Sequence, residues 1–259
     1  MHGHKRYVRA PQPVYFPSSE EMPETNRHLE LRTALYQILQ HELAARATIG
    51  SDQFVYYSPT TSKKKLAPDA FVRLGQPHAT FRVWKTWLRG APDIAVEVVS
   101  DSDEGEEDWN AKLERYREAG IGEVVRFDPD DAAHPVRVWD NIDGDLVERE
   151  VPDGELYECT SLGLFWVAVP HPAFVRMLRL ARDRSGHDLL PTPVEAEARA
   201  RQEEARARRE AEQARDNLTA EVAELRRQLE ALSTSGAKSA SRSRKPEKKR
   251  PAAQKKPRG

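Results

Sequence analysis

Only one cysteine, Cys159, occurs in the 259 residues, so no internal disulfide can form and the chain suits a reducing compartment. Long apolar runs are also lacking, and none approaches the roughly 18 residues that a membrane span needs. The N-terminal stretch MHGHKRYVRAPQPVYFP has no apolar core of the kind found in signal peptides. These absences exclude disulfide-stapled secreted domains and integral membrane proteins, and they predict a soluble, cytoplasmic protein.

The chain has little net charge, because its formal charge is −1, but the charge is unevenly distributed. Ten Lys or Arg residues and one acid lie in residues 233–259, so this tail carries about +9 and the remainder about −10. Such a composition is typical of a disordered basic arm, whose affinity for nucleic acid falls steeply with salt. The tail has no evident base-reading motif, and ribosomal RNA or acidic proteins would serve it equally well.

Composition and periodicity divide the chain into four parts. We expect an extended, Pro-rich segment, then an α/β domain, then a long helix with coiled-coil character, and finally the basic tail. Their bounds, in the same order, are 1–23, 24–193, 194–232 and 233–259. The long helix is indicated by abundant Ala, Glu and Arg and by the absence of Gly and Pro within residues 194–232.

One face of the long helix carries a short apolar seam. Its members follow the 4-3-4-3 spacing of a coiled coil: Leu218, Val222, Leu225, Leu229 and Leu232. About two heptads are clean, and upstream the same spacing meets mostly charged residues. We therefore expect a homo-oligomer held by this seam, with a solvated, unpartnered helix as the alternative.

The central domain reads as alternating strands and helices. Strands are indicated at 53–57 and 69–74, and the turn-rich segment between them predicts a hairpin. A strand at 93–100, a helix at 106–119 and a strand at 123–128 follow. This succession predicts a crossover unit with two parallel strands in a partly parallel sheet.

Further elements complete the expected domain. Thr25 or Asn26 can cap a first helix, whose apolar residues recur at helical spacing. The segment 81–90 is amphipathic and fits either a helix or a strand. A second hairpin is indicated around 141–145, and closing strands and a loop precede the long helix.

The strand at 93–100 raises the first functional question, because it looks buried on both faces and yet carries Glu97. An unpaired carboxylate there would cost several kcal/mol unless it neutralises or finds a partner. One interpretation is a structural salt bridge with Arg89 or Lys112. The other is a bound cation.

Two aspartates strengthen the second interpretation. Side chains alternate along a strand, so Asp93 shares a face with Glu97. Asp69 begins the strand at 69–74, and packing of that strand beside 93–100 would bring it near Glu97. Two carboxylates that converge at the end of a sheet suit Mg²⁺ or Mn²⁺, which prefer hard oxygen ligands. The alternatives are a turn role for Asp69 and a bracing role for Asp93.

The helix at 106–119 places Asp108 and Lys112 four residues apart on one face. As a bare pattern this is an ordinary surface salt bridge, which contributes a few tenths of a kcal/mol. A lysine beside a bound cation can instead orient or deprotonate an attacking water, or hold a phosphate.

Four segments occur in a specific order: APDAFV at 67–72, PDIAVEVVS at 92–100, EEDWNAKLERYREAG at 106–120 and FDP at 127–129. Together with shorter matches on both sides, they resemble the Uma-two family of bacterial proteins, over roughly residues 14–196. That family is regarded as restriction endonucleases with the PD-(D/E)XK nuclease fold. The resemblance implies a mixed central sheet with flanking helices.

The resemblance also implies roles for individual residues. Asp69 corresponds to the first metal-binding aspartate and Glu97 to the acid of the second motif. The lysine that normally follows two residues later is Val99 here, and Lys112 occupies the place of a lysine that relatives commonly carry on the next helix. Asp93 corresponds to an additional acid.

Three further positions are accessory. Glu24 and His28 match family positions whose roles do not follow from the residues, and a packing role is favoured for His28. Asp108 lies in an acidic insert, 101–108, that would repel a phosphate backbone unless it faces away or binds the metal itself. A departure from the family is Arg126, where a hydrophobic residue usually precedes the FDP segment.

These observations predict a restriction-endonuclease-like α/β fold and a magnesium-dependent (or manganese-dependent) endonuclease that hydrolyses DNA. Asp69 and Glu97 would hold the cation, Asp93 would assist, and Lys112 would activate or orient the water. The alternative is a catalytically silent scaffold with the same fold. It would bind nucleic acid through the tail and partner proteins through the apolar seam.

Overall fold

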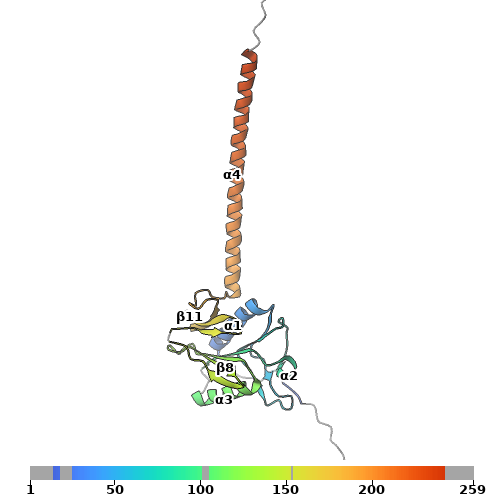
Figure 1. The fold of residues 1–259 in the computed structure, drawn as a ribbon, viewed down its shortest axis with the longest axis vertical. Helices are drawn as coiled ribbons and strands as arrows, with labels where there is room; N and C mark the ends of the chain where they lie inside the picture. Colours follow the sequence, from blue (N-terminus) through green and yellow to red (C-terminus); the bar gives the residue numbers. More distant parts are fainter. Residues whose placement is uncertain (1–13, 18–24, 101–104, 153, 243–259) are drawn as a thin grey trace, which may run out of the picture. The chain divides into compact units, whose positions relative to one another are not determined.

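The computed structural model describes residues 14–17, 25–100, 105–152 and 154–242, without the side chains of 105–108 and 233–242. The chain divides into two compact units, residues 1–196 and 197–259 (Figure 1). The first unit holds the sheets and the candidate site, and the second contains most of the C-terminal helix. No helix among the described residues is long and apolar enough to cross a membrane.

The elements follow one another along the chain in an α/β order. They are α1 Asn26–Leu43, β1 Ala47–Gly50, β2 Val55–Tyr56, β3 Lys65–Leu66, β4 Ala70–Leu74, β5 Trp84–Lys85, α2 Thr86–Arg89, β6 Ile94–Val98, α3 Gly105–Ala119, β7 Glu123–Phe127, β8 Val136–Ile142, β9 Asp145–Glu148, β10 Tyr157–Cys159, β11 Leu164–His171, β12 Val175–Ala181 and α4 Pro193–Arg242.

The central sheet has six strands in the order β1-β4-β6-β7-β8-β9. β6 and β7 run parallel and are joined by α3, whereas every other neighbouring pair is antiparallel. The sheet is therefore mixed, and the predicted crossover unit is confirmed. Gly120, at φ +72°, adopts the left-handed conformation that ends α3 after Ala119.

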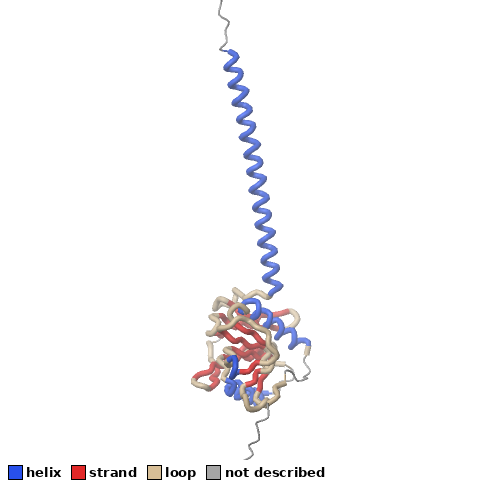
Figure 2. The backbone as a smooth tube through the Cα atoms, turned by 90° about the vertical axis from the view of Figure 1, so that its right-hand side faces the viewer, coloured by secondary structure: helices blue, strands red, loops and turns tan. Residues whose placement is uncertain are grey.

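The two faces of the central sheet are covered by different elements. On one face, leucines of α1 and the three-stranded sheet β10-β11-β12 pack against Ile94, Val96 and Val98 of β6. On the other face, α3 packs through Trp109 and Tyr116, among others. Figures 1 and 2 show α1 and α3 on opposite sides of the strands. The alternation of side chains along β6 therefore directs Glu97 towards α3.

The predicted hairpin between 53–57 and 69–74 is wrong. β2 pairs with β3 and β5 in a separate three-stranded sheet, while β4 pairs with β1 and β6. The strand β1, which follows α1 closely, takes the position beside β4 that the hairpin partner was expected to hold. Sequence signals identify which segments form strands, but they do not identify which strands pair with one another.

Other predicted boundaries hold or move slightly. Thr25 caps α1, because its hydroxyl accepts a hydrogen bond from the His28 backbone amide at 3.2 Å. The ambiguous segment at 81–90 contains both β5 and α2, and the second hairpin joins β8 to β9. The long helix continues past its predicted end at Leu232 to Arg242, and residues 243–259 lie outside the described part.

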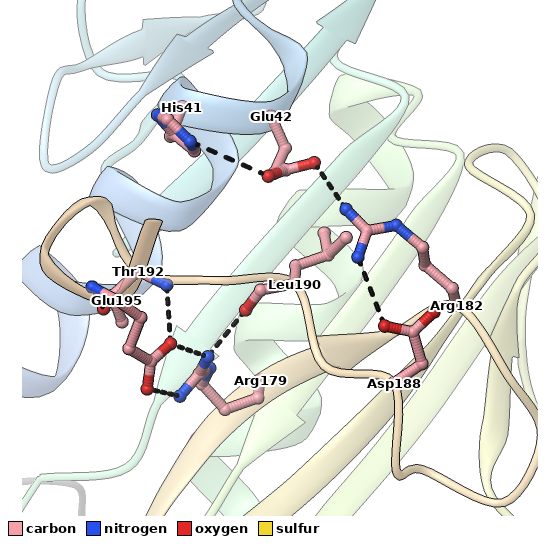
Figure 3. A network of polar contacts seen from close by, with 8 residues as sticks. All are labelled: His41, Glu42, Arg179, Arg182, Asp188, Leu190, Thr192 and Glu195. Carbon is pink, nitrogen blue, oxygen red and sulfur yellow. Dashed lines mark hydrogen bonds and ion pairs between the residues drawn. The ribbon is translucent and has the colours of Figure 1, made fainter. Parts of the chain in front are cut away.

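A polar network fastens the end of the first unit to its last sheet (Figure 3). Arg179 of β12 is only 6% exposed and donates to the Leu190 carbonyl at 2.6 Å and to Glu195 at 2.7 Å. Arg182 contacts Glu42 of α1 at 3.0 Å. A buried guanidinium needs such partners, so the network fixes where the chain leaves β12 and enters α4.

Candidate metal centre

The strands β4 and β6 place Asp69 opposite Glu97. Ala70 pairs with Val96 in antiparallel register, so the next position outward sets Asp69 against Glu97. Both residues are nearly inaccessible, at 7% and 5% exposure. The expectation that the 69–74 strand lies beside 93–100 is confirmed, although the partners on its other side differ from those predicted.

The Glu97 carboxylate has two partners on α3. Lys112 places its Nζ 2.8 Å from Oε2, and the Tyr116 hydroxyl donates a short hydrogen bond to Oε1. Lys112 and Tyr116 are four residues apart, so they share one face of the helix. This contact is the salt bridge that the structural interpretation of Glu97 expects. The same contact would place the Lys112 ammonium group close to a cation bound by Glu97.

The electrostatics of Glu97 reflect its burial. Loss of hydration raises its pKa to about 7, and the negative charge of Asp69 adds to the rise. Lys112 and Tyr116 oppose the rise because they stabilise the ionised carboxylate. A positive ion between the two carboxylates would lower the pKa further, so the pair is electrostatically suited to a cation.

Asp69 is held in place by the end of β6 and the start of α1. Its Oδ2 accepts a hydrogen bond from the Val98 amide at 2.7 Å and lies 3.2 Å from Nε2 of His28. The same nitrogen lies 3.0 Å from the Val98 carbonyl. A carbonyl can only accept, so Nε2 of His28 carries the hydrogen. His28, which matched a family position, therefore positions Asp69 through a helix whose first turn is capped by Thr25.

The donor set fits magnesium. Both contacts of Asp69 fall on Oδ2, so Oδ1 is the oxygen through which it could bind a cation, beside Glu97. Magnesium is commonly held by one or two carboxylates, with waters and substrate phosphates in its remaining positions. Among the described residues there is no group of three or more His, Cys, Asp or Glu side chains placed to hold a metal ion. Waters or a substrate would have to complete the coordination.

The structure does not bring Asp93 to this pair. Asp93 precedes β6, whereas Glu97 lies near its other end, so their Cα atoms are about 13 Å apart at the rise of a strand. The Asp93 carboxylate accepts from Arg73 at 3.0 Å and from the Leu74 amide at 2.7 Å. Asp93 and Glu97 share a face of the strand, but they lie towards its opposite ends. The contacts of Asp93 fit a bracing role and not an assisting role beside the cation.

Two accessory residues cannot be placed. Glu24 and the side chain of Asp108 lie outside the described part of the structure. Arg126, the departure from the family pattern, stacks over the ring of Trp109 at 5.6 Å from its centroid. The guanidinium covers an α3 tryptophan, which explains how the sheet accommodates a charge where relatives carry a hydrophobic residue.

Sequence reasoning missed Tyr116, which contacts Glu97 directly. The available signal was its spacing, because Tyr116 lies four residues after Lys112 and must share its face. It also missed a second buried carboxylate, Glu123 of β7, which accepts from Trp166 Nε1 at 2.9 Å and contacts Arg149 at 3.4 Å. Burial raises the pKa of Glu123, and these partners link the central sheet to β11.

Comparisons with known proteins identify a family and a solved structure that the chain resembles. The sequence model of the family Uma2, described as "Putative restriction endonuclease", matches residues 19–170. Among solved structures, the chain is similar to "a putative nuclease belonging to DUF820 from Anabaena variabilis ATCC 29413". The identity is 15% and the TM-score 0.37, and the match covers 60% of this chain and 76% of that one. No curated protein matches the chain.

The family match includes every element of the candidate centre. It spans the start of α1, the strands β4 and β6, and helix α3. Asp69, Glu97 and Lys112 all fall inside it, and it covers more than half of the chain. The chain therefore belongs to the Uma2 family, whose description reads "Putative restriction endonuclease".

Proposed function

We propose that the chain is a magnesium-dependent (or manganese-dependent) endonuclease that hydrolyses phosphodiester bonds of DNA. Family membership supports a nuclease, and the proposal adds the metal, the substrate and the residues. One observation carries it: two buried carboxylates, Asp69 and Glu97, lie opposite each other with the Lys112 ammonium 2.8 Å from Glu97. Carboxylates without a cation between them repel each other, so this geometry favours a bound cation.

Each residue has a role that follows from its contacts. Asp69 and Glu97 would hold the cation, which supplies charge stabilisation for the scissile phosphate when it is bound. Lys112, already beside Glu97, would orient the attacking water or hold a phosphate oxygen. His28 fixes Asp69, and Tyr116 fixes Glu97, so neither carboxylate has to reorganise before reaction.

The direct test uses purified full-length protein, supercoiled plasmid and Mg²⁺. Glu97→Gln, Asp69→Asn and Lys112→Met preserve approximate shape and should each reduce cleavage by at least about 100-fold. Arg73→Gln is a matched control, because Arg73 contacts Asp93 at the other end of β6. Cleavage by Glu97→Gln and Asp69→Asn at the wild-type rate would contradict the site assignment.

The second candidate is a catalytically silent scaffold with the nuclease fold. A specific observation favours it: both oxygens of Glu97 have partners within the protein, Lys112 and Tyr116. Calorimetric titration with Mg²⁺ or Mn²⁺ discriminates between the two candidates. The nuclease should release heat that the Glu97→Gln variant loses, whereas a scaffold should show no specific heat.

We also propose that the apolar seam of α4 joins two copies of the chain. All five seam residues are exposed in the single chain: Leu218, Val222, Leu225, Leu229 and Leu232. Pairing would bury them, and each Å² of apolar area removed from water contributes about 25 cal/mol. Two joined nuclease domains could cut both strands of a duplex.

A further inference from the structure

The segment that surrounds Asp69 in the sequence is strongly basic. Residues 53–92 contain seven Lys or Arg residues and a single acid, Asp69 itself. The whole chain carries −1, so the rest of the chain is net negative. This segment forms β2 to β5 and α2, and it contributes the small sheet β3-β2-β5. Two of the seven cations are ion-paired, Lys64 with Glu118 and Arg73 with Asp93, and the segment as a whole carries an excess of positive charge that attracts anions.

Two of these cations lie in one row across the small sheet. Tyr56 of β2 pairs with Lys65 of β3 on one side and with Lys85 of β5 on the other. Directly paired residues point to the same face, and neighbouring strands are about 4.8 Å apart. The two lysines therefore stand on one face, with backbones about 10 Å apart and the Tyr56 ring between them.

Aromatic rings lie against both lysines, and Lys65 places its Nζ 4.2 Å from the centroid of Phe54. Phe16 packs edge-on against Tyr56 at 4.9 Å between centroids and lies 5.5 Å from the ring of Trp87. Lys85 places its Nζ 4.4 Å from the Phe16 centroid and 5.8 Å from that of Trp87. We name this set, Lys65, Tyr56, Lys85, Phe16 and Trp87, the lysine–aromatic face.

Part of the lysine–aromatic face is open to solvent. Of its rings, Trp87 is 36% exposed, whereas Tyr56 is fully buried; Tyr15, outside the set but next to Phe16, is 81% exposed. Exposed rings among cations are the composition of a surface that binds a nucleic-acid strand, in which phosphates meet the cations and bases stack on the rings. An acidic peptide would use the cations but would leave the exposed rings without partners.

The lysine–aromatic face also lies close to the candidate metal centre. Lys65 lies four positions before Asp69 in the sequence, so their Cα atoms can be at most about 14 Å apart.

We propose that the lysine–aromatic face binds a single nucleic-acid strand, with phosphates on Lys65 and Lys85 and a base stacked on Trp87. This surface would deliver the strand to Asp69 and Glu97. The inference deepens the proposed function and rests on it for that delivery. Binding itself requires no catalysis and no cation.

The test measures binding of a fluorescent single-stranded DNA oligonucleotide to the full chain by anisotropy, in EDTA and across a range of salt. The double variant Lys65→Gln/Lys85→Gln should bind about tenfold more weakly, and its salt slope should fall by about 1.4. The matched control is Arg199→Gln/Arg208→Gln on α4, which removes the same charge from two exposed positions. The control should leave the slope unchanged, because Arg199 and Arg208 are not part of the lysine–aromatic face; the basic tail is present in every variant and contributes equally.

Trp87→Ala tests the stacking component. It should weaken single-strand binding about tenfold and leave binding of a duplex of equal length unchanged. Thermal melts and Mn²⁺ calorimetry confirm that each variant is folded with an intact centre. Wild-type single-strand affinity and salt slope in the lysine variant would overturn the inference, and so would wild-type single-strand affinity in Trp87→Ala. The proposed function fails separately, through undiminished cleavage by Glu97→Gln.

Discussion

The Glu97 carboxylate is the side chain whose protonation controls the candidate centre. Burial raises its pKa to about 7, against 4.5 for an exposed glutamate. A raised pKa in the folded state means that folding favours the protonated form. In the metal-free protein, the stability that comes from keeping Glu97 protonated is fully present below pH 4.5 and is lost as the pH rises through 7.

Denaturant unfolding in EDTA at pH 5 and pH 8 checks this linkage. Wild type should lose more free energy of unfolding over this interval than Glu97→Gln does, by an amount on the order of a few kcal/mol. Glu123 also has a raised pKa, but it is common to both proteins and cancels in the comparison. Identical pH dependence of the two proteins would mean that Glu97 is not strained by burial.

Tyr116 should set the affinity of the cation. Its hydroxyl stabilises ionised Glu97, so Tyr116→Phe should raise the pKa of Glu97 further and weaken Mn²⁺ binding at pH 7 roughly tenfold. This loss of Mn²⁺ affinity should become smaller as the pH is raised, because fewer protons then compete with Mn²⁺ for Glu97. Calorimetry at pH 7 and pH 8.5 measures both effects.

A purely structural role for Tyr116 predicts a different pattern. The stability would then fall while the pH dependence of Mn²⁺ affinity stayed as in wild type. Tyr157→Phe is the control, because Tyr157 packs against the core on the α1 side of the central sheet, away from Glu97.

At the scale of elements, the apolar seam of α4 contains information on the orientation of two helices. Val222 and Leu229 occupy a positions and Leu218, Leu225 and Leu232 occupy d positions; in parallel coiled coils, a β-branched residue such as Val222 at a with leucine at d favours an assembly of two helices. In that register Glu221 at g faces Arg226 at e of the second helix. The antiparallel arrangement instead pairs g with g and e with e, which loses this contact.

Sedimentation of the full chain tests the pairing. Leu225→Asp should convert the dimer to a monomer, whereas Ala220→Asp, on the outer face of the same helix, should leave it intact. Glu221→Arg should weaken the dimer several-fold, and adding Arg226→Glu should restore it. A monomeric wild-type chain, or failure of the double change to restore the dimer, would exclude the parallel pairing.

At the scale of the whole molecule, the nonspecific contacts that the basic tail makes with nucleic acid should be separable from those made at the candidate centre. Eight Lys or Arg residues lie in 243–259, beyond the described end of α4. Removal of residues 243–259 should lower retention on heparin and flatten the salt dependence of DNA binding by several units of slope. The rate of cleavage at saturating plasmid should change less than about twofold, since the centre lies in the first unit.

The matched control replaces the same eight cations with Gln and keeps the chain length. It should reproduce the effect of the deletion, because charge and not length releases counterions. A deletion that abolished the chemical step at saturation would show that the tail acts in catalysis, against this division of roles.

The sequence by itself determined the features whose signals are local. The cap at Thr25, the end of α3 at Gly120 and the crossover between β6 and β7 all follow from spacing, capping and breaker residues. The family motifs also fall on the elements that they predicted. Glu97 stands out because a carboxylate within an apolar strand needs a partner, and Asp69 because it begins the strand that was expected beside it.

Only the tertiary structure decided what depends on distant pairing. The partners of β2 and β4 could not be predicted, because strand edges are interchangeable until the chain closes around them. Asp93 meets Arg73, and Tyr116 meets Glu97, because register and helix placement select among equally plausible neighbours. Local chemistry identifies which residues can act, and long-range packing decides which of them meet.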